Sequence, residues 1–446
     1  MINTNNYFLF IMTEINNFID IIKSNIANAD LTYIKRHKKD GENKLLFNKA
    51  LYASLMNLKK SGLVPVRNHL EAENICNVTK QALVKNRSNC KTNKHISDLN
   101  NEMIKALYDP ENNFISPNNL KFNSDNKSFR RNNRNCKIDK SLYINRSNKR
   151  FIAIDGTIIH VDVNTATGDI VRIEPHGKYG NLLLLCLYDV VNKIPITYHP
   201  VSRNSNNKAI SENAGLIQII DSSLLNPETD VLIFDRLYYS YELINTLKKK
   251  GFECIFRVKS NSIYFNSFKC EHSKTDIVND VPVRLFKYII AKEEYCIMTT
   301  IMDDITISEI KAMYWLRWKV ETDIGKMKEK IMPNRIRSEN INSLLTDLAC
   351  VRFIEILSSY IECDRNRNLD FNFKISSAAC IDMIYDQILK LVLFDGKFKA
   401  RIKELLQIIS KNLVQIISGR SFKRCSYWPI KKWGRHGNRY AKSGEG

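Results

Sequence analysis

Four residues near position 320 have the types and spacing of a site that handles a charged substrate. Tyr314, Arg317, Glu321 and Lys328 follow one another at intervals of three, four and seven positions. On a helix at about 100° per residue they fall within a stripe about 60° wide, beside an apolar arc that would be buried. One acid flanked by an aromatic ring and two cations suits a carboxylate that binds a metal ion beside phosphates. A solvated helix with ordinary Glu–Lys pairs would show the same residue types.

Two aspartates each follow a short apolar run that is typical of a strand. Asp155 follows 150–154, and Asp235 follows 230–234. Because predicted helices alternate with these strands, both carboxylates would lie at one edge of a largely buried sheet. Three carboxylates around one point repel each other unless a divalent cation neutralises them. Either aspartate alone is an ordinary turn residue, so it is their combination with Glu321 that predicts a metal site.

The elements that must position these residues form an α/β pattern from position 150 onward. Apolar runs predict strands at 150–154, 183–190, 194–200, 230–234 and 253–258, with helices at 211–221 and 239–250. Residues 260–305 are rich in further strand-forming runs, including 263–265. Helical periodicity dominates after 307 and is clearest over 402–416.

The region before the α/β pattern is predicted to be helical from 13 to about 108. A short helix over 77–87 would begin at Asn77 or Thr79 as its N-cap and carry a basic exposed face. The residues of that face are Lys80, Lys85 and Arg87. This segment fits a helix-turn-helix reader of DNA, and it equally fits a small helical bundle with a solvated basic face.

The charge of the chain predicts a polyanionic partner. Sixty-eight Lys and Arg against 47 Asp and Glu give a net charge of +21. Much of the excess lies in two segments. The Asn-rich segment 111–150 has ten basic and three acidic residues, and the tail 419–446 has eight basic residues and one acidic residue. Nucleic acid and anionic membrane surfaces both fit such an excess. The eleven cysteines form no C-x-x-C pair, and no targeting or membrane-spanning run is apparent, so a soluble cytoplasmic protein is expected.

Three motifs resemble the acidic motifs of bacterial insertion-sequence DDE transposases. They are Ile-Asp-Gly-Thr at 154–157, Phe-Asp-Arg-Leu-Tyr at 234–238, and Y-(2)-R-(3)-E-(6)-K from 314 to 328. The last is similar to the YREK signature of the insertion-sequence-four type family. Residues 78–82 also resemble the N-terminal DNA-binding region of that family, so the resemblance spans most of the chain. It implies an α/β fold: a ribonuclease H-like catalytic domain with a β-rich insertion, flanked by helical N- and C-terminal regions.

The resemblance also implies roles for individual residues. The catalytic residues and metal ligands would be Asp155, Asp235 and Glu321. They would bind two Mg²⁺ ions, with Mn²⁺ as a substitute, one ion activating a water or a DNA 3′-hydroxyl and the other stabilising the leaving oxygen. The residues that hold DNA phosphates would be Tyr314, Arg317 and Lys328, in addition to the basic face of 77–87.

Domains and partners follow from the same resemblance. The expected segments are a helical DNA-binding domain at 1–110, a basic linker at 111–148, the catalytic domain at 149–350 with its insertion at about 260–305, and a helical region with a basic tail at 351–446. The expected partner is double-stranded DNA, both the terminal inverted repeats of the transposon and target DNA. The chain would act as a homodimer on this DNA, associated with the nucleoid and not with a membrane.

The sequence departs from the family pattern at two places, and two functions other than transposition are also compatible with it. Leu237 stands where the family usually has Gly, and the predicted insertion has no Trp, which leaves Tyr264 or Phe265 to stack a flipped base. A catalytically inactive DNA-binding relative or repressor of transposition would keep the basic segments and lose cleavage. A host metal-dependent nuclease is the third alternative. The intact carboxylates and the YREK spacing favour an active transposase.

Overall fold

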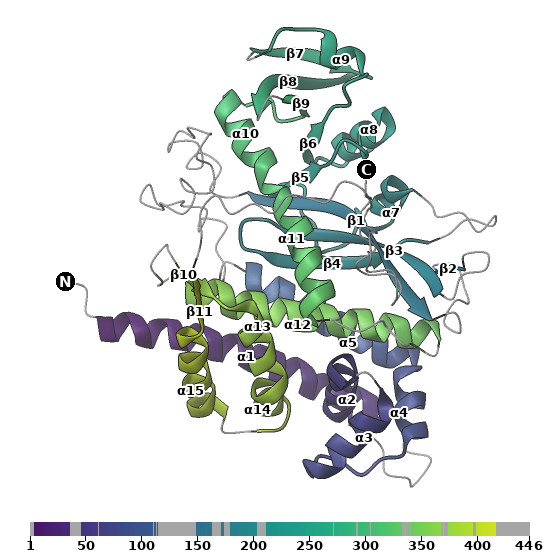
Figure 1. Ribbon diagram of the computed structural model, residues 1–446, viewed down its shortest axis with the longest axis vertical. Helices are drawn as coiled ribbons and strands as arrows, with labels where there is room; N and C mark the ends of the chain where they lie inside the picture. Colours follow the sequence, from purple (N-terminus) through teal and green to yellow (C-terminus); the bar gives the residue numbers. More distant parts are fainter. Residues whose placement is uncertain are drawn as a thin grey trace, which may run out of the picture.

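The computed structural model places the apolar runs of the sequence in one large β-sheet surrounded by helices (Figure 1). It describes residues 4–35, 46–60, 62–109, 111–112, 114, 149–162, 171–173, 179–202, 211–270, 272–290, 293–303, 305–331, 338, 340–366, 369, 373–395 and 398–415. Most of the predicted Asn-rich linker and almost all of the basic tail lie outside these residues. None of the helices within them is long and apolar enough to cross a membrane.

Five strands form the centre of the sheet, in the order β4, β3, β1, β5, β6. Their bounds and those of the two connecting helices are β1 Arg150–Asp162, β3 Tyr179–Asp189, β4 Ile194–Pro200, α7 Glu212–Ile219, β5 Asp230–Phe234, α8 Tyr241–Lys249 and β6 Glu253–Arg257. The first three strands form an antiparallel meander, and β5 and β6 run parallel to β1. This is the strand order of a ribonuclease H-like domain, and the predicted fold class is confirmed.

The middle strand β5 fixes the register of this sheet. All five of its residues are buried, as a continuous apolar run in a parallel strand would be. At its first residue, Asp230 accepts hydrogen bonds from the buried Arg150 guanidinium of β1, with which it is paired in register. At its last residue, the Phe234 ring stacks on Phe256 of β6 with 4.5 Å between centroids. These contacts hold β5 to β1 at its first residue and to β6 at its last residue.

The segment after β6 extends the same sheet. Its elements are α9 Ile263–Asn266, β7 His272–Val278, β8 Val281–Ile290 and β9 Glu293–Thr299. β9 pairs antiparallel with β6, β8 with β9, and β7 with β8, while β2 (Val171–Ile173) pairs with β3 elsewhere in the sheet. The sequence prediction of a strand at 263–265 is wrong. These residues form the short helix α9, because the Ser262 hydroxyl caps it by accepting from the Tyr264 amide.

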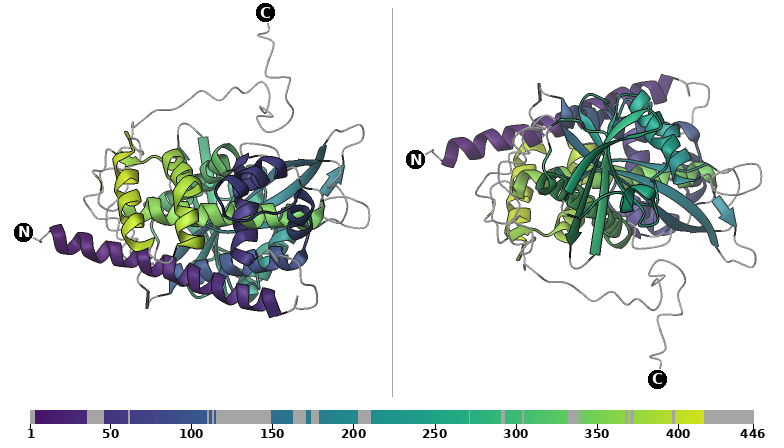
Figure 2. Two further views of the ribbon diagram at one scale, coloured as in Figure 1. Left: turned by 90° about the horizontal axis from the view of Figure 1, so that it is seen from below. Right: turned by 90° about the horizontal axis from the view of Figure 1, so that it is seen from above.

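Helices from the two ends of the chain pack together into one layer beside the sheet (Figures 1 and 2). Those before the sheet are α1 Thr4–Lys35, α2 Phe47–Lys60, α3 Leu63–Ala72, α4 Lys80–Arg87 and α5 Cys90–Tyr108. Those after it are α12 Ile341–Asn366, α13 Ser377–Met383, a π-helical turn at Ile384–Ile388, α14 Leu389–Phe394 and α15 Phe398–Lys411, with a small sheet of β10 Phe373–Ile375 and β11 Leu413–Gln415. The long helix α12 packs against α2, α5 and β4. The domain boundaries drawn from the sequence stay a prediction.

The segment that carries the YREK spacing was predicted to be one helix. The structure divides it into three elements. α10 (Ile307–Leu316) begins at a capping box in which the Thr306 hydroxyl and the Glu309 carboxylate exchange hydrogen bonds with backbone amides. α11 (Trp318–Lys326) follows after a break at Arg317, and a π-helical turn (Met327–Ile331) ends the segment. α10 packs against β8, and α11 packs against β1 and β3. The first residues of α11 therefore lie beside the strand that carries Asp155.

Candidate active site

Asp155 and Asp235 occupy equivalent positions on neighbouring parallel strands. The pairing of β1 with β5 ends at Ile154 and Phe234, which are directly opposite each other, and each aspartate is the next residue. The prediction that a strand ends at Asp155 is wrong, because β1 continues to Asp162 through its antiparallel pairing with β3. Both carboxylates are half-buried. They enter the site at the same level of the sheet, as expected for residues that follow paired parallel strands.

Glu321 reaches this edge from the first turn of α11, and a guanidinium group joins it to the strands. Arg317 Nη2 donates to Glu321 Oε1 at 3.0 Å, and Arg317 Nη1 lies 3.8 Å from Asp155 Oδ2. The Asp235 carboxylate also acts on Arg317 electrostatically. The structure thus brings the three predicted carboxylates together around the side chain of a fourth predicted residue.

The electrostatics of the site follow from burial of several acids beside one cation. Burial raises the pKa of Asp155 to about 7; Arg317 opposes this rise, while repulsion from Glu321 and Glu212 adds to it. Burial would lower the pKa of Arg317, but the neighbouring Tyr314, Asp235 and Glu321 outweigh it and raise that pKa. The raised pKa of Asp155 therefore reflects mainly its burial, which the Arg317 guanidinium offsets only in part.

The residue types and their charge fit a divalent cation. Three carboxylates against one guanidinium leave two negative charges, which is the deficit that a divalent cation would neutralise. Across the described ranges, no three His, Cys, Asp or Glu side chains are placed closely enough to share a metal ion. Since the Arg317 guanidinium lies between Asp155 and Glu321, a metal bound by both of them would take its place.

The sequence places Tyr314 and Lys328 on a stripe beside the buried arc of the helix, but both side chains are themselves buried. Tyr314 is 7% exposed and Lys328 is 6% exposed. The Lys328 ammonium donates to the Thr157 hydroxyl at 2.6 Å and to the Ile158 carbonyl at 3.0 Å, both on β1 just past Asp155. A wheel treats 314–328 as one regular helix, whereas Lys328 lies in the π-helical turn Met327–Ile331. Lys328 therefore connects the end of this segment to the strand that carries Asp155.

Glu212, on the first turn of α7, belongs to the site and was missed from the sequence. A Cβ atom added to Gly156 would lie 2.2 Å from Glu212 Oε1, so this carboxylate rests directly on the backbone beside Asp155. It lies outside the three motifs and has no spacing to them that predicts the contact. The sequence signal was indirect: a glycine follows the first aspartate, and an acid follows the helix N-cap Ser211.

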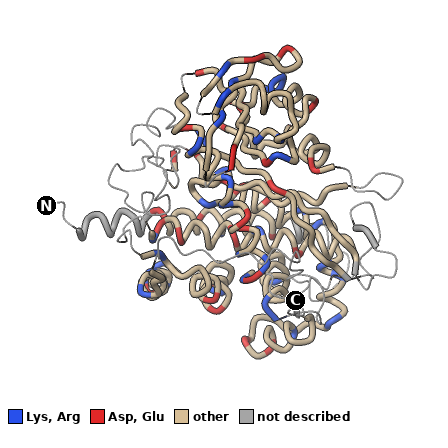
Figure 3. The backbone as a smooth tube through the Cα atoms, turned by 45° about the horizontal axis from the view of Figure 1, so that its top comes forward, with Lys and Arg blue, Asp and Glu red and all other residues tan. Residues whose placement is uncertain are grey.

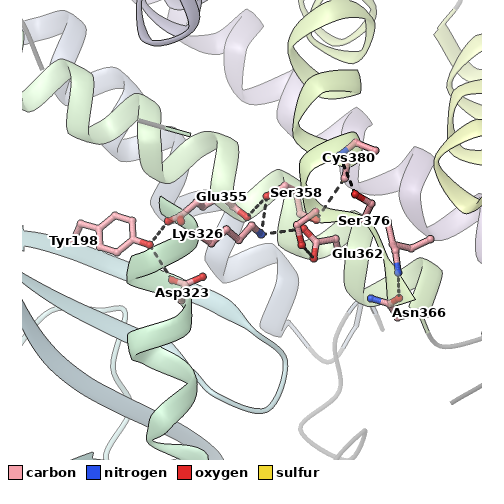
Figure 4. Close-up of polar contacts among 12 residues, drawn as sticks. Tyr198, Asp323, Lys326, Glu355, Ser358, Glu362, Asn366, Ser376 and Cys380 are labelled. Carbon is pink, nitrogen blue, oxygen red and sulfur yellow. Dashed lines mark hydrogen bonds and ion pairs between the residues drawn. The ribbon is translucent and has the colours of Figure 1, made fainter. Parts of the chain in front are cut away.

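A buried polar network holds the opposite side of α11 (Figure 4). Asp323 is two residues beyond Glu321, about 200° around the helix, and accepts from the Tyr198 hydroxyl of β4 at 3.1 Å. The same hydroxyl donates to Glu355 of α12. The Lys326 ammonium donates to Ser358 Oγ at 3.3 Å and to Glu362 Oε1 at 3.0 Å, both on α12. Helix α11 is therefore attached to β4 and α12 on one side and presents Glu321 on the other.

The basic face predicted for residues 77–87 is only partly present. α4 begins at Thr79, whose hydroxyl accepts from the Ala82 amide at 3.1 Å, as expected for an N-cap. Lys80 and Lys85 are exposed. The prediction that Arg87 is exposed is wrong, because its side chain is 3% exposed and donates twice to Asp347 of α12 at 2.7 and 2.8 Å. Its guanidinium is thereby occupied inside the helical layer.

Lys and Arg are interspersed with Asp and Glu along the described backbone (Figure 3). Residues 111–150 and 419–446, which contribute +7 each to the net charge of +21, lie largely outside it. Tyr264 and Phe265, named from the sequence for base stacking, are half-buried. Two tryptophans outside the insertion, Trp315 and Trp318, are 44% and 45% exposed and lie on either side of Arg317 in the sequence.

Comparison with known proteins gave a match to a family model and similarity to a solved structure. Residues 146–351 match a family model described as the transposase DDE domain. The matched range contains all three carboxylates and Arg317, and the match supports a DDE transposase. A solved structure, the cryo-EM structure of a piggyBac transposase synaptic complex with hairpin DNA, is similar at 15% identity and a TM-score of 0.37, over 96% of this chain and 92% of that one. The comparison with curated proteins gave no match.

Proposed function

We propose that the chain is a DNA transposase that binds the ends of its own insertion sequence and catalyses metal-dependent strand cleavage and strand transfer. The observation that carries this proposal is the convergence of Asp155, Asp235 and Glu321 on the Arg317 guanidinium. The family match supports it, because the matched residues include all four. The YREK spacing in the sequence supports the insertion-sequence-four type within this class.

The three carboxylates would hold the metal. Transposase DDE domains generally use divalent metal ions, and we propose two Mg²⁺ ions here, with Mn²⁺ as a substitute. When bound, they would supply an activated water or DNA 3′-hydroxyl and stabilise the leaving oxygen. No side chain of the protein has to act as a nucleophile in such a reaction.

The remaining site residues position the reactants. Arg317 pairs with Asp155 and Glu321 in this structure, and we propose that it contacts a backbone phosphate of the transposon end during cleavage, since a planar guanidinium suits bidentate phosphate contacts. The network of Asp323 and Lys326 keeps α11 in place behind Glu321. A rigid helix matters because catalytic groups must be held close to the productive geometry.

The DNA partner is proposed on charge. Lys80 and Lys85 are exposed on α4, and the net charge of +21 favours a polyanion. We propose that the chain binds terminal inverted repeats and target DNA as a homodimer. Phosphate contacts by these lysines and by the basic segments would position the DNA without reading its sequence.

The test is cleavage of duplex DNA that carries the sequences flanking the gene. In Mg²⁺, the wild-type chain should nick and join such ends, and a chelator should stop both reactions. Asp155→Asn, Asp235→Asn and Glu321→Gln should each reduce cleavage by roughly 1,000-fold or more, because each removes a charged metal ligand, while still retarding the same DNA in a gel. Retardation without cleavage by the wild type would instead identify an inactive DNA-binding relative. Near-normal cleavage by any one variant would remove that residue from the site.

A further inference from the structure

The hydroxyl of Tyr198 lies between two carboxyl groups that come from different helices (Figure 4). It lies 3.1 Å from Asp323 Oδ2 of α11, and it also contacts Glu355 Oε2 of α12. All three side chains are buried. A hydroxyl carries one hydrogen, so it can donate to only one of the two carboxyls at a time. The other contact needs a hydrogen from the carboxyl itself, so one of the two acids must be protonated.

The surroundings of the two acids place this hydrogen on Glu355. Burial raises the pKa of Asp323, and the Lys326 ammonium opposes that rise. The hydroxyls of Tyr198 and Tyr188 hydrogen-bond Asp323 and also favour its charged form. Glu355 is fully buried, and its Oε1 has no hydrogen-bond partner among the described residues. A buried carboxylate oxygen without a donor is far more costly than the carbonyl oxygen of a neutral acid, so Glu355 is the protonated partner.

A guanidinium one turn away on the same helix leads to the same assignment. Arg352 lies three residues before Glu355 on α12 and is 6% exposed. Its Nη1 donates to Asn101 at 2.8 Å, and its Nε and Nη2 have no hydrogen-bond partner within the described part of the chain. Opposite charges three residues apart on a helix are neighbours that attract each other. An ionised Glu355 would be expected to pair with Arg352, so their separation fits a neutral acid.

We infer that Glu355 is a neutral carboxylic acid in the folded protein and a positioning residue for Glu321. Its hydrogen is donated to the Tyr198 oxygen, which leaves the Tyr198 hydrogen for Asp323. Asp323 is two residues beyond Glu321 and about 200° around α11, so a bond that fixes Asp323 also fixes where Glu321 enters the site. The positioning role rests on the proposed function and deepens it, whereas the protonation state does not depend on that function.

Several other titratable groups interact electrostatically with Glu355. On neighbouring elements they are Cys186 and Tyr188 of β3, Tyr198 of β4, Asp323 and Lys326 of α11, Glu362 of α12, and Tyr385 of the π-helical turn at Ile384–Ile388. Lys326 is the cation of this set, and its ammonium already donates to Glu362 Oε1 at 3.0 Å. One cation that is already paired leaves the remaining charge on Asp323, and a second carboxylate at position 355 would have no counter-ion in this set.

Infrared spectroscopy of the full-length chain tests the protonation state without any DNA. The carbonyl band of a protonated carboxylic acid is separate from the bands of a carboxylate. The spectrum of wild type minus that of Glu355→Gln, at neutral pH, should therefore contain a protonated carbonyl band. Glu242→Gln is the matched control, because Glu242 is an exposed acid on α8 and should give carboxylate bands in the same subtraction. Carboxylate bands from Glu355 as well would overturn the inference.

Cleavage of end-bearing DNA tests the positioning role. Tyr198→Phe removes only the hydroxyl, and Glu355→Met removes the donor while keeping a long side chain. Each should lower Mg²⁺-dependent cleavage by roughly tenfold to 100-fold, because a small misplacement of a catalytic group has an effect of that size, while retarding the same DNA in a gel as wild type does. Glu355→Gln supplies an amide donor in place of the acid, so it should recover most of the cleavage that Glu355→Met loses.

Tyr385→Phe is the matched control for the loss of a buried hydroxyl. The Tyr385 side chain is 3% exposed, and its hydroxyl has no hydrogen-bond partner among the residues that the structure describes. This variant should cleave as wild type does, and melting temperatures would show that all variants are folded. Normal cleavage by Tyr198→Phe, or equal losses in Glu355→Gln and Glu355→Met, would contradict the positioning role.

The two measurements separate this inference from the proposed function. If wild type cleaves end-bearing DNA and the spectrum shows a carboxylate at position 355, the proposed function stands and the inference fails. If wild type does not cleave, the proposed function fails and the positioning role fails with it, while the spectrum still decides the protonation state. A protonated carbonyl band together with reduced cleavage by Tyr198→Phe supports the whole inference.

Discussion

The Lys328 ammonium group lies 2.6 Å from the Thr157 hydroxyl and connects the turn after α11 to the strand that carries Asp155. A second hydrogen bond to the Ile158 carbonyl, at 3.0 Å, reinforces this connection. The two ends of the candidate site, one on a strand and one on a helix, are thus joined directly. Lys328 supports the geometry of the site from within the protein.

Removing this connection should destabilise the fold. Lys328→Met keeps the aliphatic length but leaves the Thr157 hydroxyl and the Ile158 carbonyl without their donor, which should cost about 1–3 kcal/mol of unfolding free energy. Urea unfolding followed by circular dichroism would measure it. Lys330→Met is the matched control, because Lys330 is exposed in the same π-helical turn. Equal destabilisation in both variants would mean that loss of a positive charge, and not loss of the two hydrogen bonds, lowers the unfolding free energy.

Arg317→Lys should reduce cleavage although it preserves the charge. A lysine ammonium cannot reach Asp155 and Glu321 together with the two separate nitrogens that Arg317 uses. We expect Mg²⁺-dependent nicking of end-bearing DNA to fall by roughly tenfold or more, with binding of the same DNA within about twofold of wild type, because the fork geometry is lost and the charge is kept. Arg401→Lys, at an exposed position on α15, should cleave normally. Unreduced cleavage by Arg317→Lys would exclude a role for its fork geometry.

Glu355 should make the stability of the protein fall as the pH rises. Burial, reinforced by the nearby Asp323, raises the pKa of Glu355 well above its ordinary value. The folded state therefore favours the protonated form of Glu355. The stabilisation that this residue gives the folded protein is fully present below the ordinary glutamate pKa and is lost as the pH rises toward the raised pKa. Glu355→Gln removes this dependence. Above pH ~5, wild type should lose stability relative to Glu355→Gln by up to about 1.4 kcal/mol of unfolding free energy for each pH unit.

The measurement compares melting temperatures of the two proteins at a series of pH values above the ordinary pKa of a glutamate, where the raised pKa makes the two proteins differ. Glu242→Gln, at the exposed acid on α8, should track the wild type across the whole range. A constant difference between Glu355→Gln and wild type would show that Glu355 does not titrate differently in the folded and unfolded chains.

The pair of Arg87 and Asp347 should govern stability and not DNA binding. Both side chains are almost fully buried, at 3% and 1% exposure. Arg87→Met leaves the Asp347 carboxylate buried without its cation, which should cost about 3–5 kcal/mol. Lys80→Gln with Lys85→Gln, on the exposed part of the same helix, should leave the melting temperature unchanged. That double variant should instead lower the slope of log Kd against log salt by up to about 0.9 for each phosphate that it no longer binds. If Arg87→Met and the double lysine variant lowered the melting temperature equally, the separate roles of Arg87 in stability and of the two lysines in DNA binding would be contradicted.

The sequence was sufficient to predict the strands that carry the catalytic aspartates. The runs before Asp155 and Asp235 are rich in apolar residues, which fits strands in the middle of a sheet. Their parallel pairing then follows from the helices between them. Glu321 was also predicted to join this edge, as an acid on a helix that follows the strands, and it lies there on the first turn of α11.

Burial of the cations and the position of Glu212 could not be predicted in the same way. A helical wheel assumes a regular helix, so it missed the break at Arg317 and the π-helical turn around Lys328. Glu212 reaches the site only because Gly156 and Gly215 both allow close packing of α7 against distant strands. Such packing depends on tertiary structure, which periodicity within a single element does not encode.

The burial of Arg87 against Asp347 also has a consequence for synthesis of the chain. The two residues are 260 positions apart, so at about 5–20 residues per second Asp347 is added roughly 13–50 s after Arg87. During that interval the helix that carries Lys80 and Lys85 lacks the acceptor that completes its packing. A nascent chain released before residue 347 would keep the basic helix without its support. Full assembly of this region therefore waits until α12 has left the ribosome, after the catalytic sheet has been translated.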